Sequence, residues 1–297
     1  MKIQSIILAG LLLLLVSCNS NNKVDNQVER SIPVRVHVSD FSFSNEDFPA
    51  AATRAESSPV SYESIRAIDV AIFSGNTRVY AATQLKGDAS TYTTFGEFEC
   101  RLPIGTYTMV AVARNRSVGD EFTITSPTQA AYTTERARET FCNTQTIQVD
   151  GTTPVDVSPV MNRVMAMFWL TSTDAVPADV SRIRTTYTAG SKSFNPTTGL
   201  ATDDDGFVVT NSAKPDTSGG VLDIFSIVFL AADLETMDLT LEVLDANNVV
   251  LSTKHLKDVH FRRNQITKAT GAVFTPGPTT LTFTLNTSWL PDEHYNF

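Results

Sequence analysis

The sequence predicts an all-β protein made of two β-sandwich domains in tandem. β-branched residues dominate its apolar runs, and such residues favour strands over helices. Short segments that alternate apolar and polar residues recur along the chain, with Gly, Pro and Asn between them at turn positions. A length of 297 residues is typical of two domains rather than one.

The composition argues against several classes of protein. The chain has 23 basic and 32 acidic side chains, a formal net charge of -9, whereas a nucleic-acid binder needs a basic face. Hydrophobic residues make up 42% and charged residues 19%, which favours a packed core over disorder. With four His and three Cys, we expect no metal and no other cofactor.

The first residues have the character of an export signal. Lys2 precedes an apolar run over residues 3–16, which is shorter than the roughly 20 residues of a membrane span. The run ends in Leu15-Val16-Ser17-Cys18, which resembles the lipobox of bacterial lipoproteins. That resemblance implies a signal peptide over 1–17 and acyl chains, palmitate among them, on Cys18. An ordinary secretory signal with a chance Cys is the alternative. Polar residues 18–30 then form a tether.

We expect the first sandwich to occupy residues 31–159. Residues 32–38 alternate with period two, so that Ile32, Val34, Val36 and Val38 form one apolar face. Residues 45–61 break all periodicity and indicate an exposed loop. The further expected strands cover residues 68–73, 78–81, 95–102, 106–113, 144–149 and 155–157.

The second sandwich is expected over residues 160–297, opening with a long apolar strand at 160–170. The later strand candidates cover residues 182–188, 206–210, 222–230, 239–244, 249–255, 265–274 and 281–285. Two segments, 127–140 and 176–183, are candidates for short helices in loops.

The cysteines leave two readings open. If Cys18 carries lipid, Cys100 and Cys142 remain as an even pair in an oxidising compartment. They could form a disulfide or stay as two unpaired thiols, and no His lies near either in sequence to activate it.

Sequence motifs for catalysis are absent, and we expect no enzyme and no catalytic residue. The chain has no Gly-x-Ser-x-Gly, His-Glu-x-x-His or phosphate-binding Gly-rich motif. Asp203-Asp204-Asp205-Gly206 lacks the alternating oxygens and closing Glu of an EF-hand, so a solvated turn is favoured over a calcium site.

Several motifs occur in an order similar to that of the fimbrillin superfamily, the lipoprotein-derived subunits of the type V fimbriae of Bacteroidales. They are the lipobox at Cys18, Thr53-Arg54-Ala55 before an aromatic-ended strand, Leu102-Pro-Ile-Gly-Thr-Tyr-Thr-Met-Val-Ala-Val112, Pro159-Val-Met-Asn-Arg-Val164 and Phe261-Arg-Arg-Asn-Gln-Ile-Thr-Lys-Ala-Thr-Gly271. The resemblance implies transthyretin-like sandwiches, attachment to the outer membrane at the cell surface, and other fimbrial subunits as partners. The mature chain lacks the acidic-then-Cys-Pro opening common among anchors.

In this family a subunit whose first strand is removed offers a groove that a neighbour's strand fills. The removable strand would hold Ile32, Val34, Val36 and Val38, and a protease would cut after Arg54. A donor segment would hold Leu281, Phe283 and Leu285. An anchor instead keeps its lipid and its first strand, and we favour the anchoring or accessory subunit over a cleaved stalk or tip subunit.

A surface glycan-binding lipoprotein is an alternative of a different class. Such a protein would expose aromatic side chains to stack on sugar rings, and Trp169 and Trp289 are the only indoles. Trp169 lies within a run that is expected to be buried. An adhesive ligand on a host or bacterial surface is left open.

Overall fold

The computed structural model of the chain describes residues 31–42, 64–134, 136–213, 222–275 and 281–286. The described residues form strands, which are arranged in five sheets, together with turns and irregular segments. The predicted all-β sandwich class is confirmed. No helix long and apolar enough to cross a membrane occurs among them. Cys18, Arg54, Trp289, the signal peptide and the tether lie outside the described residues.

The N-terminal sandwich packs a three-stranded sheet against a six-stranded one. The first has the order β10 (Val155–Val157), β1 (Ile32–His37), β5 (Glu97–Leu102). The second has the order β2 (Asp40–Ser42), β11 (Val160–Arg163), β9 (Thr140–Val149), β6 (Gly105–Arg114), β3 (Ala67–Ser74), β4 (Thr77–Leu85). Both sheets contribute side chains to one buried cluster, which is the core of this sandwich.

The C-terminal sandwich is built from two four-stranded sheets around its own buried cluster. One sheet has the order β17 (Asp223–Val228), β12 (Ala166–Ser172), β20 (Ile266–Gly271), β21 (Thr282–Asn286). The other has the order β16 (Phe207–Ser212), β13 (Arg182–Tyr187), β18 (Leu234–Leu244), β19 (Val250–Arg262).

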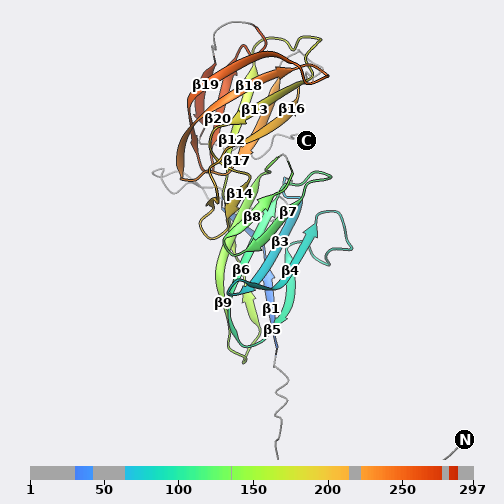
Figure 1. The fold of residues 1–297 in the computed structure, drawn as a ribbon. Coiled ribbons are helices and arrows are strands. Elements are labelled where there is room, and N and C mark those ends of the chain that lie inside the picture. Colours follow the sequence, from blue (N-terminus) through green and yellow to red (C-terminus); the bar gives the residue numbers. More distant parts are fainter. Residues whose placement is uncertain (1–30, 43–63, 135, 214–221, 276–280, 287–297) are drawn as a thin grey trace, which may run out of the picture.

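A fifth sheet joins the two sandwiches, which lie end to end (Figure 1). Its order is β15 (Leu200–Ala201), β14 (Ser193–Asn195), β8 (Gln129–Tyr132), β7 (Phe122–Ser126). Strands β7 and β8 come from the N-terminal part of the chain, and β14 and β15 come from the C-terminal part. Because β14 pairs with β8, backbone hydrogen bonds connect the two parts directly.

A third apolar cluster fills the space beneath this sheet, and we call it the junction core. Phe194 of β14 is fully buried there and stacks on Phe229 with ring centroids 4.6 Å apart. Alternate residues of β3 serve two cores, since Ile72 packs in the N-terminal core and Phe73 in the junction core. A strand covered on both faces needs a continuous apolar run rather than alternation, and β3 is buried from Ala67 to Phe73.

The expected long strand over 160–170 is two strands in different sandwiches. Residues 160–163 form β11, which pairs with β2 and β9 of the N-terminal sandwich, whereas β12 begins the C-terminal one. At the end of β11 the Arg163 side chain is fully buried and pairs with Glu139 of the N-terminal part of the chain at 2.7 Å. The chain therefore crosses between the sandwiches after Arg163, later than the boundary expected at residue 160.

The two short helices expected from the sequence are wrong for the described residues. Within 127–140, residues 129–132 form β8, and the later part is an irregular segment held by an ion pair of Arg138 with Asp120 at 2.7 Å. Within 176–183 the chain makes a turn and then enters β13. Pairing of β8 with two neighbouring strands outweighs a local preference for helix.

The junction core predicts that the two sandwiches unfold together. Replacement Phe194→Ala removes a fully buried ring, and we expect the free energy of unfolding to fall by about 3–5 kcal/mol and the single transition to separate into two. Differential scanning calorimetry measures both effects. Val118→Ala, at a side chain that is 98% exposed, serves as the control. A single transition at the original temperature in Phe194→Ala would contradict this coupling.

Candidate functional site

The N-terminal segment, residues 31–42, completes both sheets of the first sandwich. Strand β1 lies between two partners, antiparallel to β5 and parallel to β10. The side chains of Ile32, Val34, Val36 and Val38 are all buried, the last three at 1% exposure or less. Each such side chain contributes about 1.5–3 kcal/mol through burial, so the segment seals the core.

Strand β2 continues the segment into the opposite sheet, where it forms the edge beside β11. Phe41 of β2 is buried and meets Phe141 of β9 edge to face, with centroids 5.1 Å apart. One stretch of twelve residues, 31–42, therefore supplies a central strand to one sheet and an edge strand to the other. Its loss would divide the three-stranded sheet, remove the edge strand of the six-stranded sheet and uncover their shared core.

The C-terminal strand β21 is an edge strand of its own sandwich. It pairs antiparallel with β20 alone, from Thr270 opposite Thr282 to Ile266 opposite Asn286. Phe283 is 40% exposed, Thr282 and Thr284 are exposed, and Leu281 packs partly against the second core. The Leu285 side chain lies outside the described part. Ladder hydrogen bonds hold β21 more than burial does, so it presents a partly apolar edge.

The candidate disulfide is not formed, and Cys100 and Cys142 are free thiols. Cys100 lies on β5 of the three-stranded sheet and packs against the first core, whereas Cys142 lies on β9 and faces the junction core. The Cys142 Sγ donates to the Pro196 carbonyl at 3.6 Å. Burial raises the pKa of Cys100 to about 11 and that of Cys142 to about 12, so neither is an activated nucleophile.

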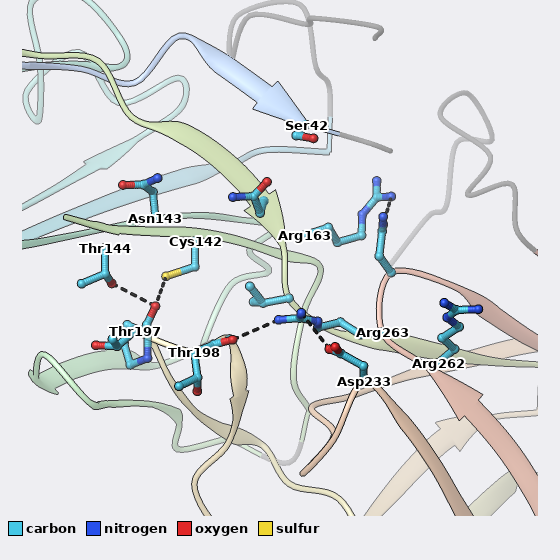
Figure 2. A pocket seen from close by; sticks show the side chains of 15 residues that line it. Ser42, Cys142, Asn143, Thr144, Arg163, Thr197, Thr198, Asp233, Arg262 and Arg263 are labelled. Atoms are coloured by element: carbon cyan, nitrogen blue, oxygen red, sulfur yellow. Dashed lines mark hydrogen bonds and ion pairs between the residues drawn. The ribbon is translucent and has the colours of Figure 1, made fainter. Parts of the chain in front are cut away.

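A polar pocket with a cavity volume of about 510 Å³ lies where the two sandwiches meet (Figure 2). The pocket is lined by residues of β9 and β11, by the turn between β14 and β15, and by the turn between β19 and β20. We call it the junction pocket. Its lining residues are Ser42, Cys142, Asn143, Thr144, Asn162, Arg163, Val164, Pro196, Thr197, Thr198, Gly199, Asp233, Arg262, Arg263 and Asn264.

Two turns shape this pocket, and each contains a residue with positive φ. Gly199 has a φ of +72°, and an added Cβ would stand 2.8 Å from Arg263 Nη1, so only Gly lets the β14–β15 turn approach so closely. Asn264 has a φ of 59°, a conformation that Asn tolerates better than most residues. Its turn brings Arg262 and Arg263 to the pocket.

Arginines dominate the charge around the pocket. Arg163 pairs with Glu139, donates to Asn264 Oδ1 at 3.0 Å and lies 4.8 Å from the centre of the Phe141 ring. Arg263 pairs with Asp233 at 2.7 Å and donates to the Thr198 carbonyl at 3.0 Å. These contacts tie β11, the β14–β15 turn and the β19–β20 turn together, and Figure 2 shows those of Arg263.

Five residues of this pocket lie in two motifs of the sequence. Asn162 and Arg163 belong to the segment 159–164, and Arg262, Arg263 and Asn264 belong to the segment 261–271, yet nothing along the chain brings the two segments together. The sequence feature that pointed to this site was the pair of adjacent arginines, Arg262 and Arg263, in an acidic chain, followed by Asn264, a residue typical of turns.

The acidic run 203–205 forms a turn that is held by hydrogen bonds. Asp203 Oδ2 accepts from Ser193 Oγ at 2.7 Å, and Asp204 accepts from the backbone N–H of Gly190. Among the described residues no group of three His, Cys, Asp or Glu side chains is placed to hold a metal ion. Burial, followed by the hydrogen bond and charge of Asp204, raises the pKa of Glu235 from 4.5 to about 7.

The described indole is not a surface platform. Trp169 is 7% exposed, its Nε1 donates to Asp223 Oδ1 at 3.1 Å, and Lys268 Nζ lies 4.8 Å from its ring centre. A sugar ring therefore cannot reach its face without displacing protein.

Residues 32–293 match the model of a family described as a family of unknown function, DUF6562. No curated protein matches the chain significantly.

The chain is similar in fold to several solved structures. One, described as putative polysaccharide binding proteins (DUF1812) from Bacteroides thetaiotaomicron, is 12% identical with a TM-score of 0.49 and covers 73% of this chain and 77% of its own. The fimbrial anchor protein Mfa2 from Porphyromonas gingivalis is 12% identical with a TM-score of 0.46, covering 81% and 90%. A fimbrial assembly protein from Parabacteroides distasonis is 14% identical with a TM-score of 0.39, covering 86% and 94%.

All three TM-scores are below 0.5, so the likeness does not transfer the functions of these proteins to this chain.

The raised pKa of Glu235 predicts a pH dependence of stability. The folded-state pKa of about 7 exceeds the ordinary 4.5, so folding favours the protonated carboxyl. Its stabilising contribution is complete below pH 4.5 and is lost as the pH rises through 7. Glu235→Gln should remove this fall and raise the free energy of unfolding at pH 8 by about 1 kcal/mol, a value reduced by partial exposure.

Urea denaturation at pH 5, 6, 7 and 8 measures the effect. Glu99→Gln, at an exposed side chain of β5, should keep the wild-type pH slope. An unchanged slope in Glu235→Gln would show that the pKa of this carboxyl is not raised in the folded protein.

Proposed function

The chain belongs to the family of unknown function DUF6562, and for this member we propose a structural role as a lipid-anchored, accessory or anchoring subunit of a surface fimbrium. The role is architectural and includes no catalytic step. One observation carries the proposal: residues 31–42 complete both sheets of the first sandwich, with β1 between β10 and β5. A subunit that keeps this segment is closed at its first sandwich and accepts no strand there.

The lipobox at Cys18 lies only a short polar tether before β1. If Cys18 carries acyl chains, the segment that closes the first sandwich is also the segment attached to the outer membrane. Cleavage between Cys18 and β1 would detach the protein from the membrane. Cleavage after Arg54 would cut the covalent link between β2 and the rest of the chain, so that only strand pairing and packing would hold β1 and β2 in the sandwich. Retention of lipid and closure of the sandwich are therefore one property of an anchor.

Contact with the next subunit is proposed at the other end of the chain. The proposed donor segment contains Leu281, Phe283 and Leu285 at alternate positions of the sequence, and Phe283 of β21 is exposed. Backbone hydrogen bonds supply affinity in such strand addition, and the alternate side chains supply register. In the isolated chain β21 pairs with β20, so assembly requires either exchange of this strand or extension at its free edge.

The alternative role within the same assembly is a stalk or tip subunit matured by cleavage after Arg54. The starting residue of the cellular protein decides between the two roles. The alternative of a glycan-binding lipoprotein that stacks sugars on indoles is not supported by Trp169, which is buried.

The anchor role predicts that the protein on intact cells begins at an acylated Cys18 and stays with membranes after treatment with an arginine-specific protease. Mass spectrometry of the amino-terminal peptide gives the measurement. Cys18→Ala should release the protein from membranes, whereas Cys100→Ala should leave it attached. A cellular protein that begins at an unmodified Ala55 would instead establish a cleaved stalk or tip subunit.

Strand-mediated assembly predicts different effects for two neighbouring substitutions on β21. Phe283→Asp places a charge among the alternate apolar side chains and should abolish co-purification of other fimbrial subunits. Thr284→Asp points to the opposite face and should leave co-purification intact. Both side chains are exposed, so thermal stability should change little in either variant. If other fimbrial subunits co-purify equally with both variants, β21 does not form the contact.

A further inference from the structure

Two turns at one end of the first sandwich are placed to touch a lipid surface. They join β5 to β6, at residues 103–104, and β9 to β10, at residues 150–154, and we call them together the tether pole. We propose that the tether pole rests on the membrane that holds Cys18, with the side chain of Ile104 inserted among the lipids. The inference rests on the proposed attachment through Cys18 and adds a non-covalent contact to it.

The chain enters the first sandwich at this pole. Ile32, at the start of β1, pairs with Leu102 at the end of β5, directly before the first turn. Arg101 donates to the Ser31 carbonyl at 2.6 Å, so the backbone that precedes β1 is held beside that turn. The segment that leads to Cys18 therefore leaves the sandwich next to Ile104.

The second turn lies at the same end, and the tether limits how far this end can move from the membrane. Gly105, at the start of β6, pairs with Val149 at the end of β9. Residues 19–30 separate Cys18 from Ser31, and such a segment spans at most about 45 Å when fully extended. With Cys18 acylated, the tether pole is the part of the described protein that lies closest to the lipids.

Ile104 is an exposed apolar side chain in a well-ordered turn. It is 62% exposed. The Tyr107 hydroxyl donates to the Pro103 carbonyl at 3.0 Å and fixes the turn from below. The Ile104 side chain leans across the second turn, where a Cβ added at Gly151 would stand 2.6 Å from Ile104 Cδ1. Because the side chain is already held in place, its insertion into lipid costs little conformational freedom.

The surroundings of Ile104 suit the surface of a bilayer. Residues 102–106 and 151–155 contain apolar, hydroxyl and glycine residues and no charged side chain. Arg101 and Asp150 flank them with one charge of each sign. The Asp150 carboxylate accepts hydrogen bonds from the backbone and the hydroxyl of Thr152, both at 2.9 Å. Contact therefore depends on apolar insertion, and added salt should change it little.

One inserted side chain is a weak contact that becomes effective in a tethered protein. Removing the exposed part of an Ile side chain from water favours the contact by about tenfold, which cannot hold a free protein at a membrane. A short tether keeps the pole beside the bilayer at high effective concentration, so the same preference populates the contact. We expect contact in the acylated protein and none in Cys18→Ala.

Quenching by spin-labelled lipids tests the contact. The full-length acylated protein is reconstituted into vesicles of phosphatidylethanolamine and phosphatidylglycerol that contain doxyl-labelled lipid. A nitrobenzoxadiazole fluorophore is attached to Ile104→Cys or to the control Val118→Cys. Both variants carry Cys100→Ser, and the remaining Cys142 is buried.

Val118 is a matched control because it is 98% exposed and follows β6, whose length places it about 30 Å from the tether pole. A tenfold preference keeps the label at position 104 mostly in lipid, so its quenching should exceed that at position 118 by about threefold or more.

A second label reports on the tether pole while Ile104 is varied. Thr153→Cys places the fluorophore on the second turn, where the side chain is exposed. Quenching at position 153 should be retained with Ile104→Leu, which keeps the apolar volume. It should fall with Ile104→Asp to the level measured at position 118, because a carboxylate does not enter lipid. Melting temperatures establish that each variant is folded.

Equal quenching at positions 104 and 118 would overturn the contact. Unchanged quenching at position 153 in Ile104→Asp would also overturn it, by showing that the tether alone brings the pole near the bilayer. Flotation of the vesicles separates these results from a failure of the anchor role. Protein that floats with the vesicles and gives either result keeps its lipid anchor and loses only the proposed contact. Protein that does not float lacks the anchor, and the contact fails with it.

Discussion

Burial of both faces of strands β3 and β6 in the six-stranded sheet is the constraint on which the rest of this structure depends. One face of β3 and β6 packs on the N-terminal core, and the other packs on the junction core beneath β8 and β14. A surface that is apolar on both sides cannot remain in water, so the second sandwich is fixed to the first rather than connected by a flexible linker. The junction pocket owes its existence to this fixed arrangement, because its walls come from both sandwiches.

The N-terminal segment illustrates how one short stretch serves several purposes. Because β1 and β2 lie in opposite sheets, the segment acts as a clasp across the first sandwich, and its ends lie near the tether on one side and the junction pocket, lined by Ser42, on the other. The hydrophobic contribution of Val34, Val36, Val38 and Phe41 makes the clasp a stable part of the fold.

Much of the fold follows from local pattern, and the remainder depends on partners distant in sequence. The alternation at Ile32, Val34 and Val36 is enough to predict β1 and its buried face, because one side of that strand faces water. The run 160–170 could not be divided from sequence, because an apolar segment does not reveal which of two cores it enters, and the pairing of Arg163 with Glu139 depends on the folded chain. The pocket was equally hidden, since its two arginine-bearing segments are some hundred residues apart.

The parallel pairing of the clasp has a consequence for the order in which the molecule can be made. Val34 finds its partner in Val155, and Asp40 finds its partner in Val160, both far along the chain. Contacts of such long sequence separation form late, because the entropy of closing a large loop opposes them. Residues 31–42 must therefore wait for residue 157 before the three-stranded sheet is complete, and for residue 163, near mid-chain, before the six-stranded sheet is complete.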